Sequence, residues 1–454
     1  MAFSKLDPSR TAFGAPGQPS PDKEEQTEVG SYFIANYPPF SFWSEKHLSA
    51  VEEALVRPPD PRVPLGLYLH IPFCRKRCKF CYFKVYTEKT SRDVEAYVSA
   101  LADEVGLYSR FPAFSQRSLR FVYFGGGTPS FLSPRQLLSF VERLREFVNW
   151  DGAEEVTFEC EPGTLSRSKV EALKEIGVTR LSLGVENFDD AILRENGRAH
   201  ESAEIYQSYE WIKEADFPNV NIDLIAGMVG ETEQNWEACV RKTIELAPDS
   251  VTIYQMELPY NTVYSHEIRI EGQPVPVAGW EQKRAWVGNA FADLERAGYR
   301  VSSGYTVVKD SKPGKFSYRD SLWHGADMVG AGVSSFSFVG GVHFQNLDRI
   351  EDYVATVGKG RLPLKRALPV GDTERLIREL ILQMKLGSLD LAYFREKFQR
   401  DVIKEFQPAF EALKRQSYLD WEGDRVVLSR QALLRVDTLL PSFFLPEHRN
   451  ARYT

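Results

Sequence analysis

The chain has little of several features that mark common classes of protein. Its 454 residues include only five cysteines, and two of these, Cys160 and Cys239, stand alone. That is poor material for a disulfide framework and is typical of the reducing cytoplasm. No apolar run reaches the length of about 18 residues that a membrane-spanning helix needs, and the N-terminus has no apolar signal core. We therefore expect a cytoplasmic protein with no membrane span.

The chain also has no excess of positive charge. The formal net charge is −7 at pH 7, so the chain lacks the basic footprint of a nucleic-acid-binding protein. This charge is otherwise ordinary for a soluble protein. The length is sufficient for two or three domains and a large buried core. We therefore expect an enzyme-sized globular protein with no nucleic-acid partner.

Three of the five cysteines lie close together. Cys74, Cys78 and Cys81 have the spacing C-x3-C-x2-C. Three thiolates on one short loop can hold three irons of a [4Fe–4S] cluster and leave the fourth iron open. A structural zinc site usually takes four ligands in two separated pairs. The spacing alone favours the cluster but leaves two alternatives open, a zinc site that recruits His70 and three reduced thiols.

Strand and helix patterns alternate from about residue 65. Expected strands cover 65–71, 119–124, 155–159, 180–183, 220–225, 250–256 and 299–303, and expected helices cover 93–109, 134–148, 167–176, 203–215, 233–246 and 281–297. Ser91 lies near the start of the first helix, and Ser133 is the expected N-cap of the second. Repeated βα units predict parallel strands with right-handed crossovers. Periodicity does not distinguish an open sheet from a closed or partial barrel.

The two ends of the chain differ from this middle part. Residues 1–30 are poor in large apolar groups and are predicted to be mostly disordered. Residues 31–43 begin an arm that extends to about 60 and is dense in aromatics; it is expected either to pack on the core or to cover a site. From about 371 we expect helices through 415, a hairpin over 420–428 and a last helix over 429–440. This pattern predicts a small winged-helix-like α+β domain that is not basic and serves as a cap or substrate wall.

The run from Tyr68 to Cys81, Tyr-Leu-His-Ile-Pro-Phe-Cys-Arg-Lys-Arg-Cys-Lys-Phe-Cys, resembles the signature of the radical S-adenosylmethionine (SAM) superfamily. In that superfamily the SAM amino and carboxylate groups chelate the fourth iron. More narrowly, the run resembles the oxygen-independent coproporphyrinogen III oxidase family, which includes heme chaperones and class C radical SAM methyltransferases. The resemblance implies an α/β fold with a partial (β/α)6 barrel over about 61–305, a distal region over 306–370 that closes the substrate cavity, and the family's C-terminal domain over 371–445.

The same resemblance implies a set of SAM-binding residues at the carboxyl ends of the strands. The glycine loop of residues 124–129 supplies Gly126, Gly127 and Thr128, and we expect its N–H groups to face the SAM amino and carboxylate region. Glu159 is the expected acceptor for the ribose hydroxyls, and Glu161 is its neighbour that points elsewhere.

Five further positions are expected to contact ligands. Tyr68 is expected to stack on SAM or substrate, and Phe80 to pack over the cluster. Arg198 and Asp223 match positions near a second SAM. Relatives usually carry Gln where this chain carries Glu186, which would place a negative charge near a SAM sulfonium. His70 is either a ligand-side residue or a core histidine with a satisfied hydrogen bond.

The resemblance implies a [4Fe–4S] cluster, one or two molecules of SAM, and an electron donor such as flavodoxin or ferredoxin. The leading hypothesis is oxidative decarboxylation of a tetrapyrrole propionate to a vinyl group. The first alternative is a radical C-methyltransferase that uses two SAM molecules. The second is a heme chaperone that keeps the cluster but delivers heme. Cys160 and Cys239 are expected to be buried structural thiols.

Overall fold

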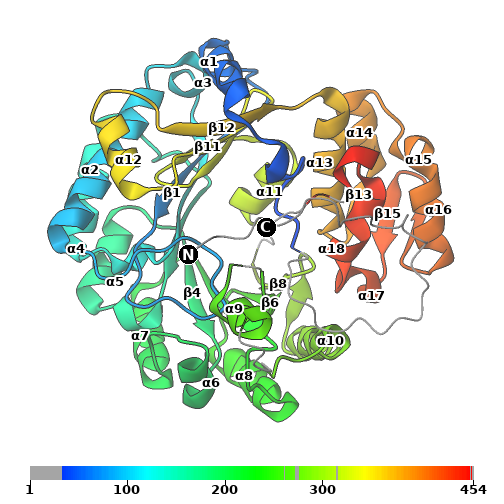
Figure 1. The fold of residues 1–454 in the computed structure, drawn as a ribbon. Coiled ribbons are helices and arrows are strands. Elements are labelled where there is room, and N and C mark those ends of the chain that lie inside the picture. The colour runs from blue at the N-terminus through cyan, green and yellow to red at the C-terminus, as the bar shows by residue number, and fades with distance from the viewer. Residues whose placement is uncertain (1–32, 260, 271–275, 313–314, 450, 452–454) are drawn as a thin grey trace, which may run out of the picture.

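The protein is described by a computed structural model that covers residues 33–259, 261–270, 276–312, 315–449 and 451. The predicted tail 1–30 and the first two residues of the aromatic arm lie outside this part of the chain. The main body is a 12-stranded sheet with the order β12-β11-β10-β9-β1-β2-β3-β4-β5-β6-β8-β7. It curves around a central space and has two free edges (Figure 1), so it is a partial barrel.

Seven neighbouring strands of this sheet run parallel. In sheet order they are β9 (Asp327–Ala331), β1 (Leu65–Ile71), β2 (Leu119–Gly126), β3 (Glu155–Cys160), β4 (Arg180–Glu186), β5 (Asn219–Ala226) and β6 (Ser250–Gln255). Six of the seven are the strands that the βα alternation predicts. The expectation of an α/β fold built on parallel strands is therefore confirmed.

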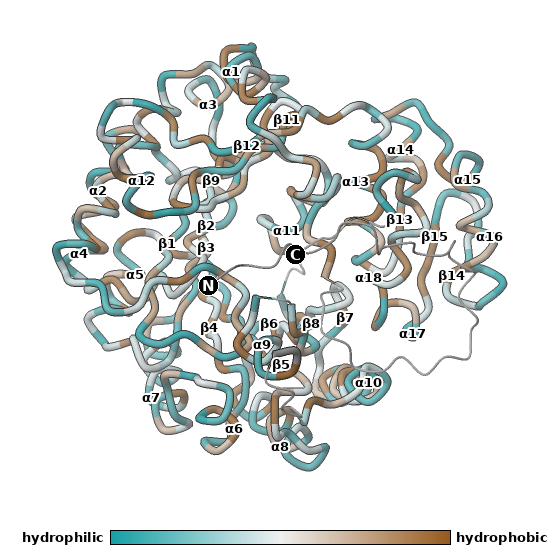
Figure 2. Tube along the Cα trace, in the orientation of Figure 1, coloured by the Kyte–Doolittle hydropathy of each residue, from teal (hydrophilic) through white to brown (hydrophobic). Residues whose placement is uncertain are grey.

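Most helices between the strands cover the outside of the sheet (Figure 1). They are α2 (Ser91–Tyr108), α3 (Pro112–Ser115), α4 (Pro134–Arg145), α5 (Arg167–Glu175), α6 (Asp190–Glu195), α7 (Ser202–Ala215), α8 (Glu233–Leu246) and α10 (Trp280–Arg296). Teal and brown stretches alternate along them in Figure 2, as expected for amphipathic helices on a sheet. α9 (Val263–Ile270) instead packs beside the loop that follows β1, where Val263 donates its N–H to the Lys79 carbonyl.

Local capping chemistry sets where two of these helices begin. The Ser133 hydroxyl caps α4 by accepting a hydrogen bond from the backbone N–H of Gln136. The Gln136 side chain in turn accepts one from the backbone N–H of Ser133, which completes a capping box. α2 has the same arrangement between Thr90 and Asp93. The helix therefore begins at Ser91, two residues before the expected start at 93, because the capping box satisfies the free N–H groups there.

Antiparallel strands extend the sheet at both edges. β10 (Phe336–Val339), β11 (Val342–Asn346) and β12 (Leu364–Pro369) follow β9, with α12 (Ile350–Val357) between the last two; β8 (Thr306–Lys309) and β7 (Tyr299–Val301) follow β6, with α11 (Ser317–Trp323) after β8. The strand expected over 299–303 ends at Val301 because the N–H groups of Ser302 and Ser303 turn back to the Thr306 carbonyl.

The aromatic arm packs between the sheet edge and the C-terminal part of the chain. Tyr37 is fully buried, and its ring lies 5.0 Å from that of Phe444. Phe40 lies 4.5 Å from Phe336 between ring centroids, and Ser44 pairs with Ala367 of β12. The arm then enters α1 (Leu48–Val56). These contacts support the alternative in which the arm fastens onto the core.

The C-terminal unit has its own apolar core, which includes Leu380, Phe394, Phe410 and Val426. It consists of α13 (Asp372–Met384), α14 (Leu391–Phe398), α15 (Val402–Glu405) and α16 (Gln407–Arg415) with a three-stranded antiparallel sheet of order β13 (Ser388–Asp390), β15 (Arg425–Leu428) and β14 (Leu419–Glu422). The hairpin predicted over 420–428 is confirmed as β14 and β15.

The prediction of a single helix over 429–440 is wrong. The chain forms two short helices, α17 (Arg430–Leu433) and α18 (Val436–Leu439), with a break at Arg435. The break places the carboxylate of Asp437 2.8 Å from the backbone nitrogen of Ile34 and 2.7 Å from Nζ of Lys385. A buried ammonium without a carboxylate partner is costly, so this pairing favours the interrupted conformation.

The close approach of β9 and β10 generates a test of the fold. A Cβ added at Gly330 would lie 2.2 Å from the Phe336 carbonyl oxygen, whereas one at Gly152 would meet nothing within 4 Å. We expect Gly330→Ala to lower the free energy of unfolding by about 1–3 kcal/mol or more, because backbone cannot yield as a side chain can. Urea unfolding measures this. Gly152→Ala is the matched control and should change little; equal midpoints for the two variants would contradict the strand geometry.

Candidate functional site

The three clustered cysteines lie on the loop that leaves β1, here called the cysteine loop (residues 72–87). Its two ends are tied together, because Tyr86 donates its N–H to the Pro72 carbonyl at 2.8 Å and Cys74 donates its N–H to the Tyr86 carbonyl at 3.1 Å. All three cysteines are half-buried free thiols. The loop is thus a closed, ordered turn that presents three sulfur atoms at the carboxyl end of β1.

The donor set fits a cluster better than a single metal ion. Among the described residues, no group of three His, Cys, Asp or Glu side chains is placed to hold one ion, and this covers both a set with His70 and the three cysteines themselves. Burial lowers the pKa of His70 to about 4, and its Nδ1 lies 3.4 Å from the Tyr68 hydroxyl, so it is a neutral core histidine. Burial also raises the pKa of Cys74 to about 12, which keeps the thiol protonated until a metal displaces the proton.

The glycine loop packs closely against the end of β1 and the cysteine loop. Gly127 donates its N–H to the Ile71 carbonyl at 2.8 Å, and Thr128 donates to the Phe73 carbonyl at 2.9 Å. The Thr128 hydroxyl donates to Sγ of Cys74 at 3.3 Å. A Cβ at Gly127 would lie 3.0 Å from the same sulfur. Only glycine therefore leaves room for the sulfur at this distance.

This contact corrects one expectation about the glycine loop. Its N–H groups do not face an open ligand space. That of Gly127 bonds to the end of β1, that of Thr128 bonds to the cysteine loop, and that of Gly126 donates to Oε2 of Glu159 at 3.1 Å. Parallel pairing of β1 and β2 brings the two loops together at one edge of the sheet. The glycines allow the two loops to approach closely, and their N–H groups donate within the protein rather than to a ligand.

Glu159 lies at the end of β3 inside the barrel. Its Oε1 accepts a hydrogen bond from the Tyr123 hydroxyl at 2.7 Å. Burial, with a smaller contribution from Asp223, raises the pKa of Glu159 to about 7. Glu161 points elsewhere, as expected: its Oε1 lies 3.5 Å from Arg75 and 3.6 Å from Nδ1 of His200. β3 ends at Cys160, so Glu161 belongs to the turn that follows the strand and is not held on the same face as Glu159.

Tyr68 belongs to a row of tyrosines on the inner face of the barrel. It pairs with Tyr123 on the neighbouring strand, and their rings stack 5.6 Å apart between centroids. The Tyr123 ring in turn lies 4.2 Å from that of Tyr318 in α11. The row ends beside Glu159, so an acidic group and a flat aromatic wall share one inner surface.

Glu186 has an unusual backbone at the end of β4. Its φ is +64°, a left-handed conformation that costs a non-glycine residue energy, and the pairing with β5 shifts between Gly184 and Glu186. Its side chain is 13% exposed and lies 3.8 Å from the guanidinium of Arg198. Burial raises the pKa of Glu186 to about 7 in spite of that guanidinium.

Arg198 links this acidic surface to the cysteine loop. One guanidinium nitrogen lies 3.4 Å from Sγ of Cys78, and the other donates to the Gly184 carbonyl at 2.8 Å. Its Nε is buried with no partner among the described residues.

Asp223 on β5 accepts hydrogen bonds from Ser182 at 2.7 Å and from Asn221 at 2.9 Å. Burial raises the pKa of Asp223 as well.

Phe80 lies apart from this group. Its ring packs against an apolar cluster that includes Ile192, Met228 and Met256. That position supports the loop from the side and does not show the expected packing over the cysteines.

Cys160 and Cys239 are buried and isolated, as expected for structural thiols.

Several residues at the site were not among the predicted ones. They are Tyr123 and Tyr318 of the aromatic row, His200 beside Glu161, and Ser182 and Asn221 beside Asp223. Tyr123 could have been found from the sequence, because it lies two residues before Gly125 and therefore faces the same side of the predicted strand. The other contacts depend on strand register or on α11, which no sequence pattern indicated.

The raised pKa of Glu186 makes a prediction about stability. Between its ordinary pKa of 4.5 and the folded value of about 7, the unfolded chain loses the proton first, so folding stability falls as pH rises. Glutamine cannot ionise. We therefore expect Glu186→Gln to be more stable than the parent by about 1–3 kcal/mol at pH 8 and by little at pH 5, as measured by urea unfolding of the ligand-free protein.

The control for this measurement is Glu175→Gln, an exposed glutamate at the end of α5. It makes the same chemical change on the surface and should shift stability little at either pH. A Glu186→Gln variant less stable than the parent at pH 8 would show that the ion pair with Arg198 outweighs the cost of burial.

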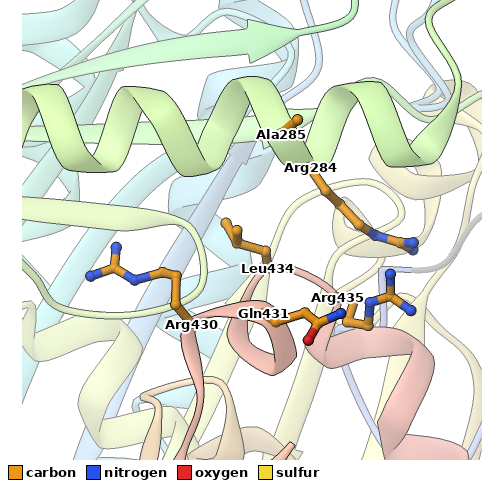
Figure 3. Close-up of a pocket in the computed structure, with 6 residues that line it drawn as sticks. All are labelled: Arg284, Ala285, Arg430, Gln431, Leu434 and Arg435. Atoms are coloured by element: carbon orange, nitrogen blue, oxygen red, sulfur yellow. The ribbon is translucent and has the colours of Figure 1, made fainter.

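A separate cavity lies between α10 and the turn that joins α17 to α18 (Figure 3). It has a volume of about 310 Å³ and is lined by Arg284, Ala285, Arg430, Gln431, Leu434 and Arg435. Figure 3 shows Leu434 pointing toward α10 and the side chains of Arg284 and Arg435 directed to the same side. None of the predicted site residues lines this cavity.

Comparison with known proteins agrees with this geometry. Residues 68–242 match the family described as the radical SAM superfamily. The chain is 32% identical over 325 residues to the heme chaperone HemW of Lactococcus lactis, spanning 71% of this chain and 78% of that protein. It is 28% identical over 412 residues to the oxygen-independent coproporphyrinogen III oxidase of Pseudomonas aeruginosa, spanning 86% and 88%.

A solved structure extends the match to the fold. The coproporphyrinogen III oxidase of Escherichia coli superposes with a TM-score of 0.78 and 22% identity, covering 92% of this chain and 99% of that one. At this identity the likeness shows the fold alone. Taken with the shared sequence, it leads to one conclusion: the chain belongs to the radical SAM superfamily and, within it, to the family of oxygen-independent coproporphyrinogen III oxidases and HemW heme chaperones.

Proposed function

We propose that the protein is a radical SAM enzyme that acts on a tetrapyrrole by oxidative decarboxylation, in the manner of the coproporphyrinogen III oxidases. The superfamily implies a [4Fe–4S] cluster and SAM. We assign Cys74, Cys78 and Cys81 as the cluster ligands, because they are the three free thiols that one closed loop presents together. When bound, a reduced cluster with an open iron would supply an electron to SAM and release the radical that takes hydrogen from the substrate.

The charges inside the barrel support a cationic ligand there. Glu159, Glu186 and Asp223 are three buried carboxyl groups, and burial raises the pKa of each. The guanidinium of Arg198 is the cation that lies beside Glu186. Buried carboxylates are stable only when paired. A sulfonium and an ammonium on one ligand would complete the pairing, and these are the charged groups of SAM.

The chain's own residues would orient that ligand. The buried Nε of Arg198 is one donor without a partner in the described chain, and it lies next to Cys78, where a SAM carboxylate would be held. Glu159 is fixed by Tyr123 and Gly126, so its remaining lone pairs point to a ribose. Glu186 and Asp223 lie on the next two strands, β4 and β5, and are the acidic residues that a second SAM would meet.

The observation that carries the tetrapyrrole assignment is the extent of the match to the oxidases. The alignment to the Pseudomonas aeruginosa enzyme covers 88% of that protein. The tyrosine row of Tyr68, Tyr123 and Tyr318 adds a flat wall inside the barrel, and Tyr254 at the end of β6 remains 43% exposed. Flat aromatic surfaces suit a planar or bowl-shaped ring of pyrroles.

A second function has its own support. The Lactococcus lactis relative with 32% identity is a heme chaperone, so heme binding without turnover is the competing proposal. The third possibility is a C-methyltransferase with two SAM molecules, for which Glu186 in place of Gln would mark different handling of the second sulfonium. The buried acidic group fits this possibility equally well.

Cluster assignment has a direct test. We expect Cys78→Ala, expressed and reconstituted anaerobically, to lose the visible absorbance and most of the iron of the parent protein, because two thiolates hold a [4Fe–4S] cluster poorly. Cys239→Ala is the control, since that thiol is buried and lies away from the loop. Unchanged iron content in the Cys78 variant would overturn the assignment.

The reaction is tested by its products. The reconstituted protein is incubated anaerobically with reductant, SAM and coproporphyrinogen III and followed by mass spectrometry. Loss of carboxyl mass together with 5′-deoxyadenosine is the expected result. Formation of S-adenosylhomocysteine with a methyl group added to an acceptor would move the enzyme to the methyltransferases. Neither product, with heme retained in stoichiometric amount, would establish the chaperone.

A further inference from the structure

The cysteine loop is strongly basic in a chain that is acidic overall. Residues 72–87 include no aspartate or glutamate, whereas the whole chain has a net charge of −7. The loop's cationic residues are Arg75, Lys76, Arg77, Lys79 and Lys84. Three of the five fall between the first two cysteines. Such a local reversal of sign creates a positive potential over a small part of the surface.

Part of this charge is not neutralised within the molecule. Arg75 pairs with Glu161 at 3.5 Å and Lys79 with Glu195 at 3.1 Å. Arg77 instead donates to two backbone carbonyls, those of Cys81 and Asn261. Lys76 and Lys84 are exposed, and neither forms an ion pair within the described part of the chain. Three cations therefore remain available to a partner.

The position of these cations matters because the same loop carries the cysteines. The groups that would meet SAM, namely Arg198, Thr128 and Gly127, contact the sulfur atoms from the barrel. Lys76 and Arg77, which separate Cys74 from Cys78 in sequence, lie exposed to solvent. The sulfurs are thus contacted from the barrel, whereas the basic side chains of the same loop are exposed to solvent.

We propose that the solvent side of the cysteine loop is the docking surface for an acidic one-electron donor protein of the flavodoxin type. This inference rests on the proposed function, since it needs a cluster on the three cysteines. The donor loses one electron and the cluster gains it, with no atom or proton transferred. Lys76 and Arg77 lie between Cys74 and Cys78 in sequence, so a donor bound to them would be close to the metal.

Charge complementarity favours a protein over a small anion. The free cations are exposed and spread over nine residues, from Lys76 to Lys84, rather than gathered around a buried pocket. Spread, exposed charges suit small, transient interfaces of the kind that electron-transfer partners form. They mainly speed encounter and fix orientation, which a donor that must bind and leave at each reduction requires.

The test reverses two of the free charges. We expect Lys76→Glu/Lys84→Glu to raise the concentration of reduced flavodoxin needed for half-maximal cluster reduction about tenfold at low salt, with a smaller difference at high salt. Reduction by dithionite should be unchanged, because a small reductant needs no docking surface. Cluster reduction is followed by the loss of visible absorbance, so the readout does not depend on product formation.

The matched control is Arg110→Glu/Lys213→Glu, which makes the same change in net charge. Arg110 and Lys213 are exposed and lie at the ends of α2 and α7, where the chain turns back toward the beginning of the next strand, so they occupy the opposite end of the barrel from the cysteine loop. We expect this variant to require no more flavodoxin than the parent does. An equal loss in both variants would show a general charge effect and overturn the docking surface.

Binding is measured separately from electron transfer. Titration of oxidised flavodoxin into the full chain, without reductant or SAM, should give a dissociation constant about tenfold higher for Lys76→Glu/Lys84→Glu than for the control. Equal constants would overturn the inference. If dithionite fails to reduce any cluster in the parent, the proposed function fails, yet the binding comparison still decides the docking surface. Slower reduction by dithionite as well would show that the lysines act on the cluster itself.

Discussion

The hydrogen bonds between two loops hold the whole site in place. Gly127 and Thr128 donate to carbonyls of the β1 end and the cysteine loop, and the Thr128 hydroxyl reaches Sγ of Cys74. These bonds exist only because β1 and β2 are parallel neighbours whose carboxyl ends meet at one edge. A side chain at Gly127 would push the loops apart. The sheet topology, the glycine and the position of the cysteines are therefore one constraint.

Burial decides the electrostatics of the barrel interior. Three carboxyl groups on adjacent strands each have a raised pKa, with loss of solvation as the largest cause. Hydrogen bonds from Tyr123 and Ser182 offset part of this cost. One guanidinium lies in contact with Glu186, at 3.8 Å, which is too far for a strong hydrogen bond. The interior is thus organised for a positive ligand before any ligand is present.

The fold could be predicted from the sequence wherever long periodic segments specify it. Six parallel strands and their helices follow from alternation, and Ser133 and Gln136 mark a helix start. The edge strands β10 to β12 and the break at Arg435 could not be predicted, because they are short and depend on partners such as Phe336 with Phe40 and Asp437 with Lys385 that are distant in sequence. At the site, motifs located the cysteines and Glu159, whereas Tyr318 and the left-handed backbone of Glu186 follow from packing that no local pattern encodes.

Charges of opposite sign lie close to the cysteine loop. Acidic groups near Arg198 lie in the barrel, whereas the loop itself carries Lys76, Arg77 and Lys84 and no acidic residue. In the proposed function a cationic ligand would be drawn to the acidic groups and an acidic protein to the basic residues, since each set of charges repels the other's partner. The three cysteines would hold the cluster between these charges, so that the donated electron and SAM meet at one group. One short loop would then serve two binding functions that charges of one sign could not.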